Sequence, residues 1–447
     1  MRTHRVVSLM LHLRFFGMLA ALLAGASAGL AQATPHGGEF QVNTFTTGNQ
    51  AVPAVAVDPL GRTLVVWISA AEGGDPGWGL RGQLYAADGT AQGGPFQVNS
   101  ATTLNQDGPR VAATPDGDFV VVWGSSVSTG SDIAGRSIQA RRFASDGTPF
   151  GPDFQVNTYT SGNQNLPDVA TDGAGDFVIV WQSAGSSGSD TLGSSVQGQR
   201  FSAAGVPQGV EFQVNTSTVG DQTSPRVAAN PAGDFWVVFE TNVAAGGDPS
   251  ASVQARFFDA AGVPAGPEFT LNGFTDGDQE RPAIAADATG TFLAVWQSFD
   301  SGGTDTFPPS IQGYLLNSIG EAIGDEFQVN TFTTGTQMRP TVAAFGASGF
   351  VAAWENLPNP GPGQTPDIRA AQVGVGNDFV VNTLTTNSQE YTSIAADPAG
   401  NFIVAWSSNG SAGTDSDLYS VQAQRYDALF RDGFESNDTA RWSAIAP

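Results

Sequence analysis

The chain has 447 residues, contains no cysteine, and carries 42 acidic against 18 basic residues, a formal net charge of -24. A charge of this sign and size repels nucleic-acid phosphates and anionic membrane surfaces, so neither is expected as a partner. The lack of cysteine excludes disulfides, lipid-modified cysteine and thiol nucleophiles. No lysine occurs, and the histidines are confined to positions 4, 12 and 36. Carboxylates, Tyr, Ser, Thr and Arg therefore remain for any chemistry.

Residues 1–33 are typical of a secretory signal peptide. Arginines at positions 2, 5 and 14 precede an apolar stretch from Phe15 to Leu23, and the small-residue site Ala31-Gln32-Ala33 ends the segment. The stretch is shorter than the roughly twenty apolar residues of a membrane span, and no later segment reaches that length. We expect removal of 1–33 to make the net charge more negative by three, and the protein to be secreted, extracellular or on the surface of a Gram-negative-type bacterium.

Beyond a short N-terminal lead at 34–39, one unit is repeated seven times. A tetrapeptide, usually Phe-Gln-Val-Asn, recurs at intervals of 52 to 58 residues, starting at Phe40, Phe96, Phe154, Phe212, Phe269, Phe327 and Phe379. An aromatic residue that ends an apolar run keeps the same interval, at Trp67, Trp123, Trp181, Phe239, Trp296, Trp354 and Trp406. Such periodicity is typical of repeat architectures.

Each unit contains four strand-like pieces separated by turn-forming residues. In the third unit these pieces are predicted at 168–171, 177–183, 195–201 and 212–215, and the first two are joined by a compact hairpin. The second piece is apolar without alternation, which in an antiparallel sheet indicates that both faces are covered. Blades of a β-propeller meet this condition, because every sheet lies between two neighbours.

The order of the pieces favours a closed ring over a linear array of small sheets. The chain starts with a fourth-type strand at Phe40 and ends with three strands, the last finishing at Tyr426. The N-terminal strand is therefore predicted to complete the last sheet, which removes two exposed sheet edges. We predict an all-β, seven-bladed propeller of four-stranded antiparallel blades over 40–426.

A glutamine follows the Asn of each tetrapeptide at a constant spacing of seven residues. One interpretation is that these amides satisfy backbone groups where the chain crosses between blades. The other is a polar ring around a central channel that binds a ligand. The glutamines are Gln50, Gln106, Gln164, Gln222, Gln279, Gln337 and Gln389.

The repeated tryptophans are predicted core residues, and Trp181→Ala is expected to cost about 3 to 5 kcal/mol. They are Trp67, Trp123, Trp181, Trp296, Trp354 and Trp406.

The loops between the second and third strands vary in length and are rich in Gly, Ser and Asp. Variable exposed loops are where propellers carry function, and the loop lengths place them on the same face as the Asn-to-Gln connectors. Their oxygen-rich composition makes Ca²⁺ a candidate cofactor, although no loop has the Asp-x-Asp-x-Asp-Gly pattern, and solvated acidic turns are the alternative. The candidate ligands are Asp132, Asp190, Asp305 and Asp415.

The units Phe-Gln-Val-Asn-Thr, Asp-Phe-Val-Val-Val-Trp and Val-Gln-Ala-Gln-Arg-Phe resemble a tandem repeat of secreted and surface-bound bacterial proteins, including large calcium-binding adhesins. The resemblance covers nearly the whole chain after residue 33. It implies export and surface or matrix association, and it brings no catalytic residues with it.

The C-terminal segment 427–447 contains Phe-Arg-Asp-Gly-Phe-Glu-Ser from Phe430 onward. It resembles a short ending of exported Gram-negative proteins, with Asn437 where Gly is usual. A sorting tag and an edge strand that packs Trp442 on the propeller are both compatible with this segment.

The sequence favours a monomeric binding or adhesion propeller that recognises a glycan or a protein on its loop-rich face. The alternative is a carboxylate-based glycosidase or lyase that degrades polysaccharide, because propellers host such enzymes. Binding is preferred over catalysis on one ground: no unit shows extra carboxylates at an inward loop, as an asymmetric active site would require.

Overall fold

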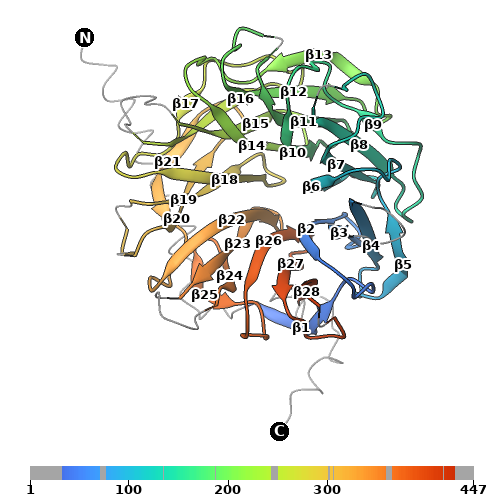
Figure 1. Cartoon of the computed structure of the whole chain (residues 1–447). Helices are drawn as coiled ribbons and strands as arrows, with labels where there is room; N and C mark the ends of the chain where they lie inside the picture. The colour runs from blue at the N-terminus through green and yellow to red at the C-terminus, as the bar shows by residue number, and fades with distance from the viewer. Residues whose placement is uncertain are drawn as a thin grey trace.

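The computed structural model describes residues 33–70, 77–133, 135–186, 188–242, 250–300, 303–305, 307–358, 365–415 and 417–427. Within them, 28 strands form seven four-stranded antiparallel sheets, arranged as the blades of a ring (Figure 1). The predicted all-β, seven-bladed propeller is thereby confirmed. The predicted signal peptide up to residue 32 and the C-terminal segment from 428 lie outside the described residues. None of the described segments forms a helix long and apolar enough to cross a membrane.

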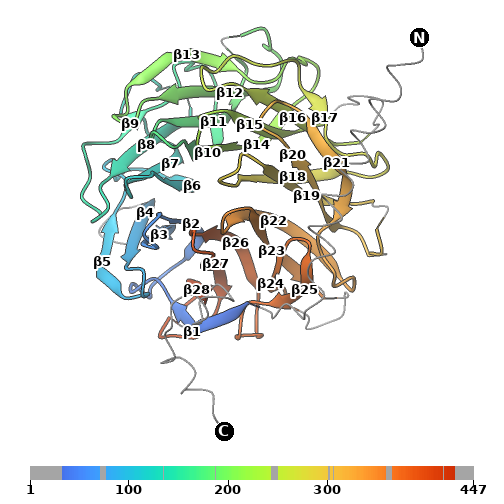
Figure 2. The ribbon, with the colours of Figure 1, turned by 180° about the vertical axis from the view of Figure 1, so that it is seen from behind.

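The strands of each blade are called inner, second, third and outer, in order of distance from the central axis, and both views show the inner strands around that axis (Figures 1 and 2). The inner strands are β2 (Gln50–Val57), β6 (Gln106–Ala113), β10 (Gln164–Thr171), β14 (Gln222–Ala229), β18 (Gln279–Ala286), β22 (Thr336–Phe345) and β26 (Gln389–Ala396). The second strands are β3 (Thr63–Ala70), β7 (Phe119–Ser125), β11 (Phe177–Ala184), β15 (Phe235–Thr241), β19 (Phe292–Ser298), β23 (Gly349–Leu357) and β27 (Phe402–Asn409).

The third strands are β4 (Trp78–Tyr85), β8 (Ser137–Phe143), β12 (Ser194–Phe201), β16 (Ser252–Phe258), β20 (Ser310–Leu316), β24 (Asp367–Gln372) and β28 (Tyr419–Asp427). The outer strands are β5 (Ala91–Gln97), β9 (Phe154–Gln155), β13 (Pro207–Gln213), β17 (Phe269–Thr270), β21 (Ala322–Gln328), β25 (Val375–Val380) and β1 (Thr34–Gln41). Blades are numbered 1 to 7 from the one that starts with β2 to the one that starts with β26.

The strands of blade 3 differ from the predicted ones mainly at the two edges of the sheet. The inner strand begins at Gln164 rather than at 168, because pairing with β11 continues on the far side of a bulge between Asn165 and Asp168. The outer strand runs from Pro207 to Gln213, earlier than the predicted 212–215. The proline in the inner strand had suggested a boundary, but a bulge accommodates it within the strand.

The second strands are covered on both faces, as their unbroken apolar runs predicted. In β7, Val121 and Trp123 pack against blade 1, whereas Val120 and Val122 pack against blade 3. All four are at most 1% exposed. The core is consequently divided into seven apolar layers, one at each junction between neighbouring blades.

The N-terminal strand closes the ring by pairing with β28 in blade 7. Phe40 lies opposite Ala423 and Gln41 opposite Gln422, and the pairing extends outward to Thr34 opposite Asp427. The residues 34–39 that were treated as a lead are therefore part of β1. This closure confirms the predicted N-terminal strand of the last blade, and it covers the edge of β28 that would otherwise be unpaired.

In six of the seven blades, a carboxylate directly before the outer-strand Phe fastens the blade to the preceding connector. In blade 3, Glu211 accepts hydrogen bonds from the backbone N–H and hydroxyl of Thr158 and from the N–H of Tyr159, at 2.5 to 3.0 Å. The same position bonds the preceding connector in six blades, through Glu39, Asp153, Glu211, Glu268, Glu326 and Asp378. Blade 1 has Pro95 there. The acidic residue before each of these phenylalanines is visible in the sequence, but the predictions did not include it.

Candidate functional site

The repeated glutamines lie at the start of the inner strands and are at most 1% exposed. In blade 2, Gln106 Oε1 accepts a hydrogen bond from the indole N–H of Trp123 at 3.0 Å, and its amide donates to the carbonyl of Thr103. Blades 5, 6 and 7 show the same indole-to-glutamine bond at 2.9 to 3.1 Å. The amides thus join a blade to its own connector, and they do not form an exposed ring around the axis.

Blade 4 supports this structural interpretation, because it has Phe239 where the other blades have Trp. The phenyl ring offers no N–H to Gln222, and the Gln222 Oε1 instead accepts from Asn215 Nδ2 at 2.8 Å. The six tryptophans of the other blades are at most 1% exposed, as predicted for core residues.

The four candidate calcium ligands each bond the Asn that starts a connector. Asp132 accepts from Asn157 Nδ2 at 2.8 Å, and the same bond recurs in the other three at 2.7 to 2.8 Å. For Asp415 the donor is Asn43, so in that blade the bond also spans the closure of the ring. Since these aspartates lie on the loops and the asparagines on the connectors, both sets of segments share one face, as predicted.

The four candidate calcium ligands do not lie together. The four aspartates are buried in four separate blades. Among the described residues, no three His, Cys, Asp or Glu side chains gather closely enough to hold a metal ion. Because Ca²⁺ takes six to eight oxygen ligands, including backbone carbonyls, calcium binding at these loops stays a prediction. The observed role of the four aspartates is to hold the loop against the connector.

Every inner strand has a bulge two residues after its glutamine, and the bulge residue has a left-handed backbone. Its φ lies between 50° and 57° at Val52, Gly108, Leu166, Ser224, Arg281, Arg339 and Tyr391. Six of the seven are not glycine, and each such residue costs on the order of 1 to 3 kcal/mol of strain. The buried glutamine before the bulge and the antiparallel pairing after it hold this conformation in place.

The bulge lies at the end of the axis where the connectors lie; we call this end the mouth. Three positions meet there in each blade: the residue after the glutamine, the bulge residue, and the residue after the core aromatic of the second strand. The glutamine and the aromatic repeat, but these neighbours do not. In blades 1 to 3 they are mostly apolar or small, as at Val52, Gly124 and Leu166. The charged exception is Asp107, which is paired with Arg136.

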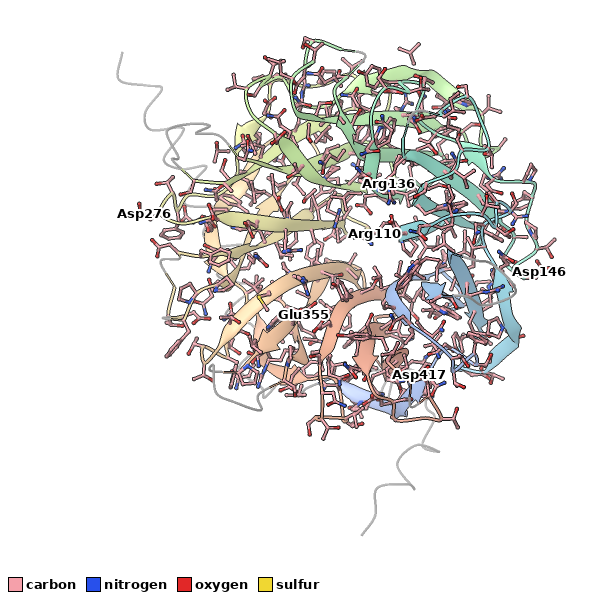
Figure 3. All side chains as sticks on the ribbon, in the orientation of Figure 1. Arg110, Arg136, Asp146, Asp276, Glu355 and Asp417 are labelled. Carbon is pink, nitrogen blue, oxygen red and sulfur yellow. The ribbon has the colours of Figure 1, made fainter. Side chains whose placement is uncertain are left out.

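Blades 4 to 7 place charged side chains at these positions. We call them the mouth cluster: Glu240, Glu280, Arg281, Arg339, Glu355, Glu390, Tyr391 and, at the start of β28, Tyr419. Figure 3 shows Glu355 toward the centre of the ring, whereas Asp146 and Asp276 lie at its periphery. The ring of seven similar blades therefore has a chemically asymmetric mouth.

Hydrogen bonds link blade 4 to blade 5 through Glu240, Glu280 and Arg281, which we call the first half of the mouth cluster. Glu240 accepts from the Thr223 hydroxyl at 3.0 Å and from the backbone N–H of Arg281 at 2.5 Å. The neighbouring Glu280 accepts from Gln297 Nε2 at 2.9 Å. Gln297 also accepts from the backbone N–H of Arg339 in blade 6, so the chain of contacts continues around the axis.

The other contacts of the mouth cluster, in blades 6 and 7, are built around the ion pair of a half-buried Arg339 with a buried Glu355. Arg339 Nη1 donates to both oxygens of Glu355, at 2.9 and 3.2 Å, and Glu355 also accepts from the backbone N–H of Tyr391 at 2.7 Å. The Arg339 guanidinium lies over the Tyr391 ring, 4.8 Å from its centroid. Glu355 is 1% exposed, so its role here is to hold Arg339 and the bulge of blade 7.

The two carboxyl groups of the first half, Glu280 and Glu240, have different surroundings. Burial raises the pKa of Glu280, and the neighbouring charges of Glu240 and Asp278 raise it further, against the opposing effect of Arg281. Glu240 accepts hydrogen bonds from two donors, the Thr223 hydroxyl and the backbone N–H of Arg281. Burial also raises the pKa of Tyr419, with Glu390 adding to the effect. Such a pair of carboxyl groups in unlike environments is the usual arrangement for acid and base catalysis.

The expectation that no unit carries extra carboxylates at an inward loop did not extend to the strands. It considered the loops, whereas the carboxylates lie on strand residues beside the repeat markers. Glu280 and Glu390 directly follow a repeated glutamine, and Glu240 and Glu355 directly follow Phe239 and Trp354. The sequence did contain a signal for these residues: the positions next to the repeated glutamines and core aromatics differ between units, and in units 4 to 7 they hold charged residues.

No protein family matches the chain by its sequence profile, and no curated protein matches it in sequence. Solved structures match it in fold. An ulvan lyase, from a family of polysaccharide lyases and bound to the repeat -[GlcA(1-4)Rha3S]-, is 12% identical with a TM-score of 0.52, over 88% of this chain and 95% of the lyase. A mutant α-L-arabinofuranosidase from Fusarium graminearum in complex with an iminosugar inhibitor is 13% identical with a TM-score of 0.50, over 75% of this chain and 98% of that chain. The polysaccharide lyase Uly1 is 11% identical with a TM-score of 0.50, over 89% and 94% of the two chains. These likenesses concern the propeller fold.

Proposed function

We propose that the mouth is the active site of an enzyme that hydrolyses glycosidic bonds in a polysaccharide, with Glu280 and Glu240 as its two carboxyl groups. The observation that carries this proposal is the asymmetry of the mouth: charged groups are concentrated in blades 4 to 7 of an otherwise repetitive ring. The catalytic alternative from the sequence is thus preferred over a binding or adhesion role. Polysaccharide-acting enzymes among the similar folds support this preference, although fold likeness alone assigns no activity.

The proposed roles follow from the surroundings of each carboxyl group. Glu280 retains its proton to a higher pH than an ordinary glutamic acid and donates it to the departing glycosidic oxygen. Glu240 is the carboxylate that acts at the sugar carbon, either on a water or directly. Arg281, next to Glu280 in sequence and exposed, supplies positive charge near the reacting groups.

Hydrolysis is preferred over elimination because the mouth holds a pair of glutamates, the groups that glycoside hydrolysis uses, and the raised pKa of Tyr419 is consistent with this preference. A lyase that uses a tyrosine as base needs that hydroxyl to lose its proton readily. The raised pKa of Tyr419 opposes this loss. Action outside the cell, which the signal-peptide prediction implies, and a monomeric state stay predictions.

The test is a panel of neutral and acidic polysaccharides, assayed for new reducing ends and for ultraviolet-absorbing unsaturated ends. We expect reducing ends without unsaturation. Glu240→Gln and Glu280→Gln should each lower turnover by about 10² to 10⁴. The matched control is Glu268→Gln, which should keep activity, because Glu268 directly precedes the outer strand β17 of blade 4 and bonds the connector residue Thr216.

A second measurement separates a catalytic acid from a structural residue. On a nitrophenyl glycoside, whose leaving group needs no protonation, Glu280→Gln should recover most of its activity and Glu240→Gln should not. Wild-type turnover should fall as the pH rises above the raised pKa of Glu280, since the acid is then ionised, and this fall should be absent in Glu280→Gln. Binding of a polysaccharide without any turnover would overturn the proposal in favour of a binding protein.

A further inference from the structure

Three charged residues of neighbouring blades meet along the central axis, deeper than the mouth cluster. Arg110, Asp168 and Arg226 occupy the same position of β6, β10 and β14, four residues after the repeated glutamine. We call them the axis triad. In the other four blades this position holds uncharged side chains, namely Ala54, Ala283, Thr341 and Ser393. Figure 3 shows Arg110 toward the centre of the ring.

The charged groups of the axis triad make few hydrogen bonds to other protein groups. Arg110 Nε lies 3.8 Å from Asp168 Oδ1, and the other oxygen of Asp168 accepts from the backbone N–H of Val227 at 2.9 Å. Arg110 and Arg226 each donate one hydrogen bond to the carbonyl of the preceding proline, at 2.9 and 2.7 Å. A guanidinium has five N–H donors, so within the described residues most donors of both groups have no protein acceptor.

The axis triad is both enclosed and reachable by solvent. Burial lowers the pKa of Arg110 to about 10, and the nearby charge of Arg226 adds to the effect while Asp168 opposes it. Nevertheless, 31% of the Arg110 side chain remains accessible to solvent. Two positive charges are therefore held near each other and near one carboxylate, with water within reach.

We propose that the axis triad binds a small oxyanion, a carboxylate or a sulfate group, between the guanidinium groups of Arg110 and Arg226. Planar guanidinium groups match the oxygens of such anions, and an anion neutralises the excess positive charge in a confined place. The site is independent of the proposed catalytic carboxylates. It also gives a local positive centre to a protein whose overall charge repels polyanions.

The test measures sulfate binding to the full chain by isothermal titration calorimetry, with sodium chloride adjusted to constant ionic strength. We expect saturable binding at one site. Arg110→Gln and Arg226→Gln should each weaken it by about tenfold or more, the loss expected for a hydrogen bond to a charged group. Arg142→Gln is the matched control, because Arg142 bonds the Ala204 carbonyl and lies over Phe150 instead of facing the triad.

The decisive variant is Asp168→Asn, because its expected effect is a gain. The amide oxygen still accepts from Val227, whereas the charge that competes with the anion is removed. Sulfate should bind more tightly than to the wild type, a result that misfolding would not produce. Absence of saturable binding in both the wild type and Asp168→Asn would overturn the proposal, as would equal losses in Arg142→Gln and Arg110→Gln.

The same titration distinguishes a free anion from one carried by a sugar. Acetate and glucuronate are compared, with glucose as the neutral control. Tighter binding of glucuronate than of acetate indicates a sugar-borne carboxylate, and equal binding indicates a free small anion. Binding of glucose at the same strength as glucuronate would contradict recognition of the charge.

Discussion

The repeated framework and the mouth of this propeller use residues that are adjacent in sequence. The framework residues are the same in most blades, whereas the mouth residues differ from blade to blade. Gln279 makes the same buried bond to a tryptophan as its equivalents in blades 2, 6 and 7. Its neighbour Glu280 has Ala51 as its equivalent in blade 1 and Met338 in blade 6. The comparison shows that the repeated residues hold the backbone in place. The residues beside them do not have this role, so their side chains can differ between blades and can carry chemistry.

The bulge connects the two regions. A left-handed residue in each inner strand is a structural device of the framework, because all seven blades have it. At Arg281 and Tyr391 the same device exposes a backbone N–H that a glutamate of the preceding blade binds. The strained left-handed backbone at Arg281 and Tyr391 thus presents the N–H groups that hold Glu240 and Glu355 in position.

The largest effect is expected from the framework. Trp181→Ala should lower the free energy of unfolding by about 3 to 5 kcal/mol, because it leaves a large cavity between blades. Trp181→Phe should cost less, since Phe239 fills the equivalent place in blade 4. Urea unfolding measures both, and turnover per folded molecule should stay unchanged. A loss below about 1 kcal/mol for the alanine variant would contradict the core assignment.

An intermediate effect is expected at the loop face. Asp132→Ala should cost about 1 to 3 kcal/mol, because an N–H of Asn157 loses its buried acceptor. The loss should be the same with calcium and with a chelator, as measured by thermal unfolding. A loss that appears only when calcium is present would instead make Asp132 a metal ligand and break the assignment of this residue to the framework.

The smallest effect on stability is expected at the mouth. Asp278→Asn should change the unfolding free energy by no more than about 0.5 kcal/mol, because asparagine can still accept from Ala251. It removes a negative charge that raises the pKa of Glu280, so that pKa falls. If Glu280 is the catalytic acid, the alkaline limb of the turnover profile should therefore move to lower pH.

The control for this shift is Asp276→Asn, which removes a charge two residues away at the periphery of the ring (Figure 3). It should leave the profile in place. Equal shifts in the two variants would mean that a change in overall charge, rather than the proximity of Asp278 to Glu280, moves the limb.

Much of the fold could be predicted because its determinants are local and repeated. The unbroken apolar run around Val178 indicates a strand covered on both sides, and the position of Phe40 indicates how the ring closes. The start of β10 was missed, because a proline inside an inner strand is compatible with pairing only when a bulge accommodates it. The carboxylates before the outer-strand Phe, such as Glu211, were present as a pattern but became interpretable only through their distant partners.

The sequence by itself determined the number of blades, the core aromatics and the face on which the loops lie, because each depends on a spacing or pattern within one unit. Only the tertiary structure decided what the aspartates of the loops do and which side chains meet at the axis. Glu240, Glu280, Arg339 and Glu355 come from three consecutive blades, and the packing of each blade on the next is what brings them together. The contacts from blade to blade, such as those of Glu240 with Arg281 and of Glu355 with Tyr391, join residues about 40 positions apart, so no pattern within a unit reports them.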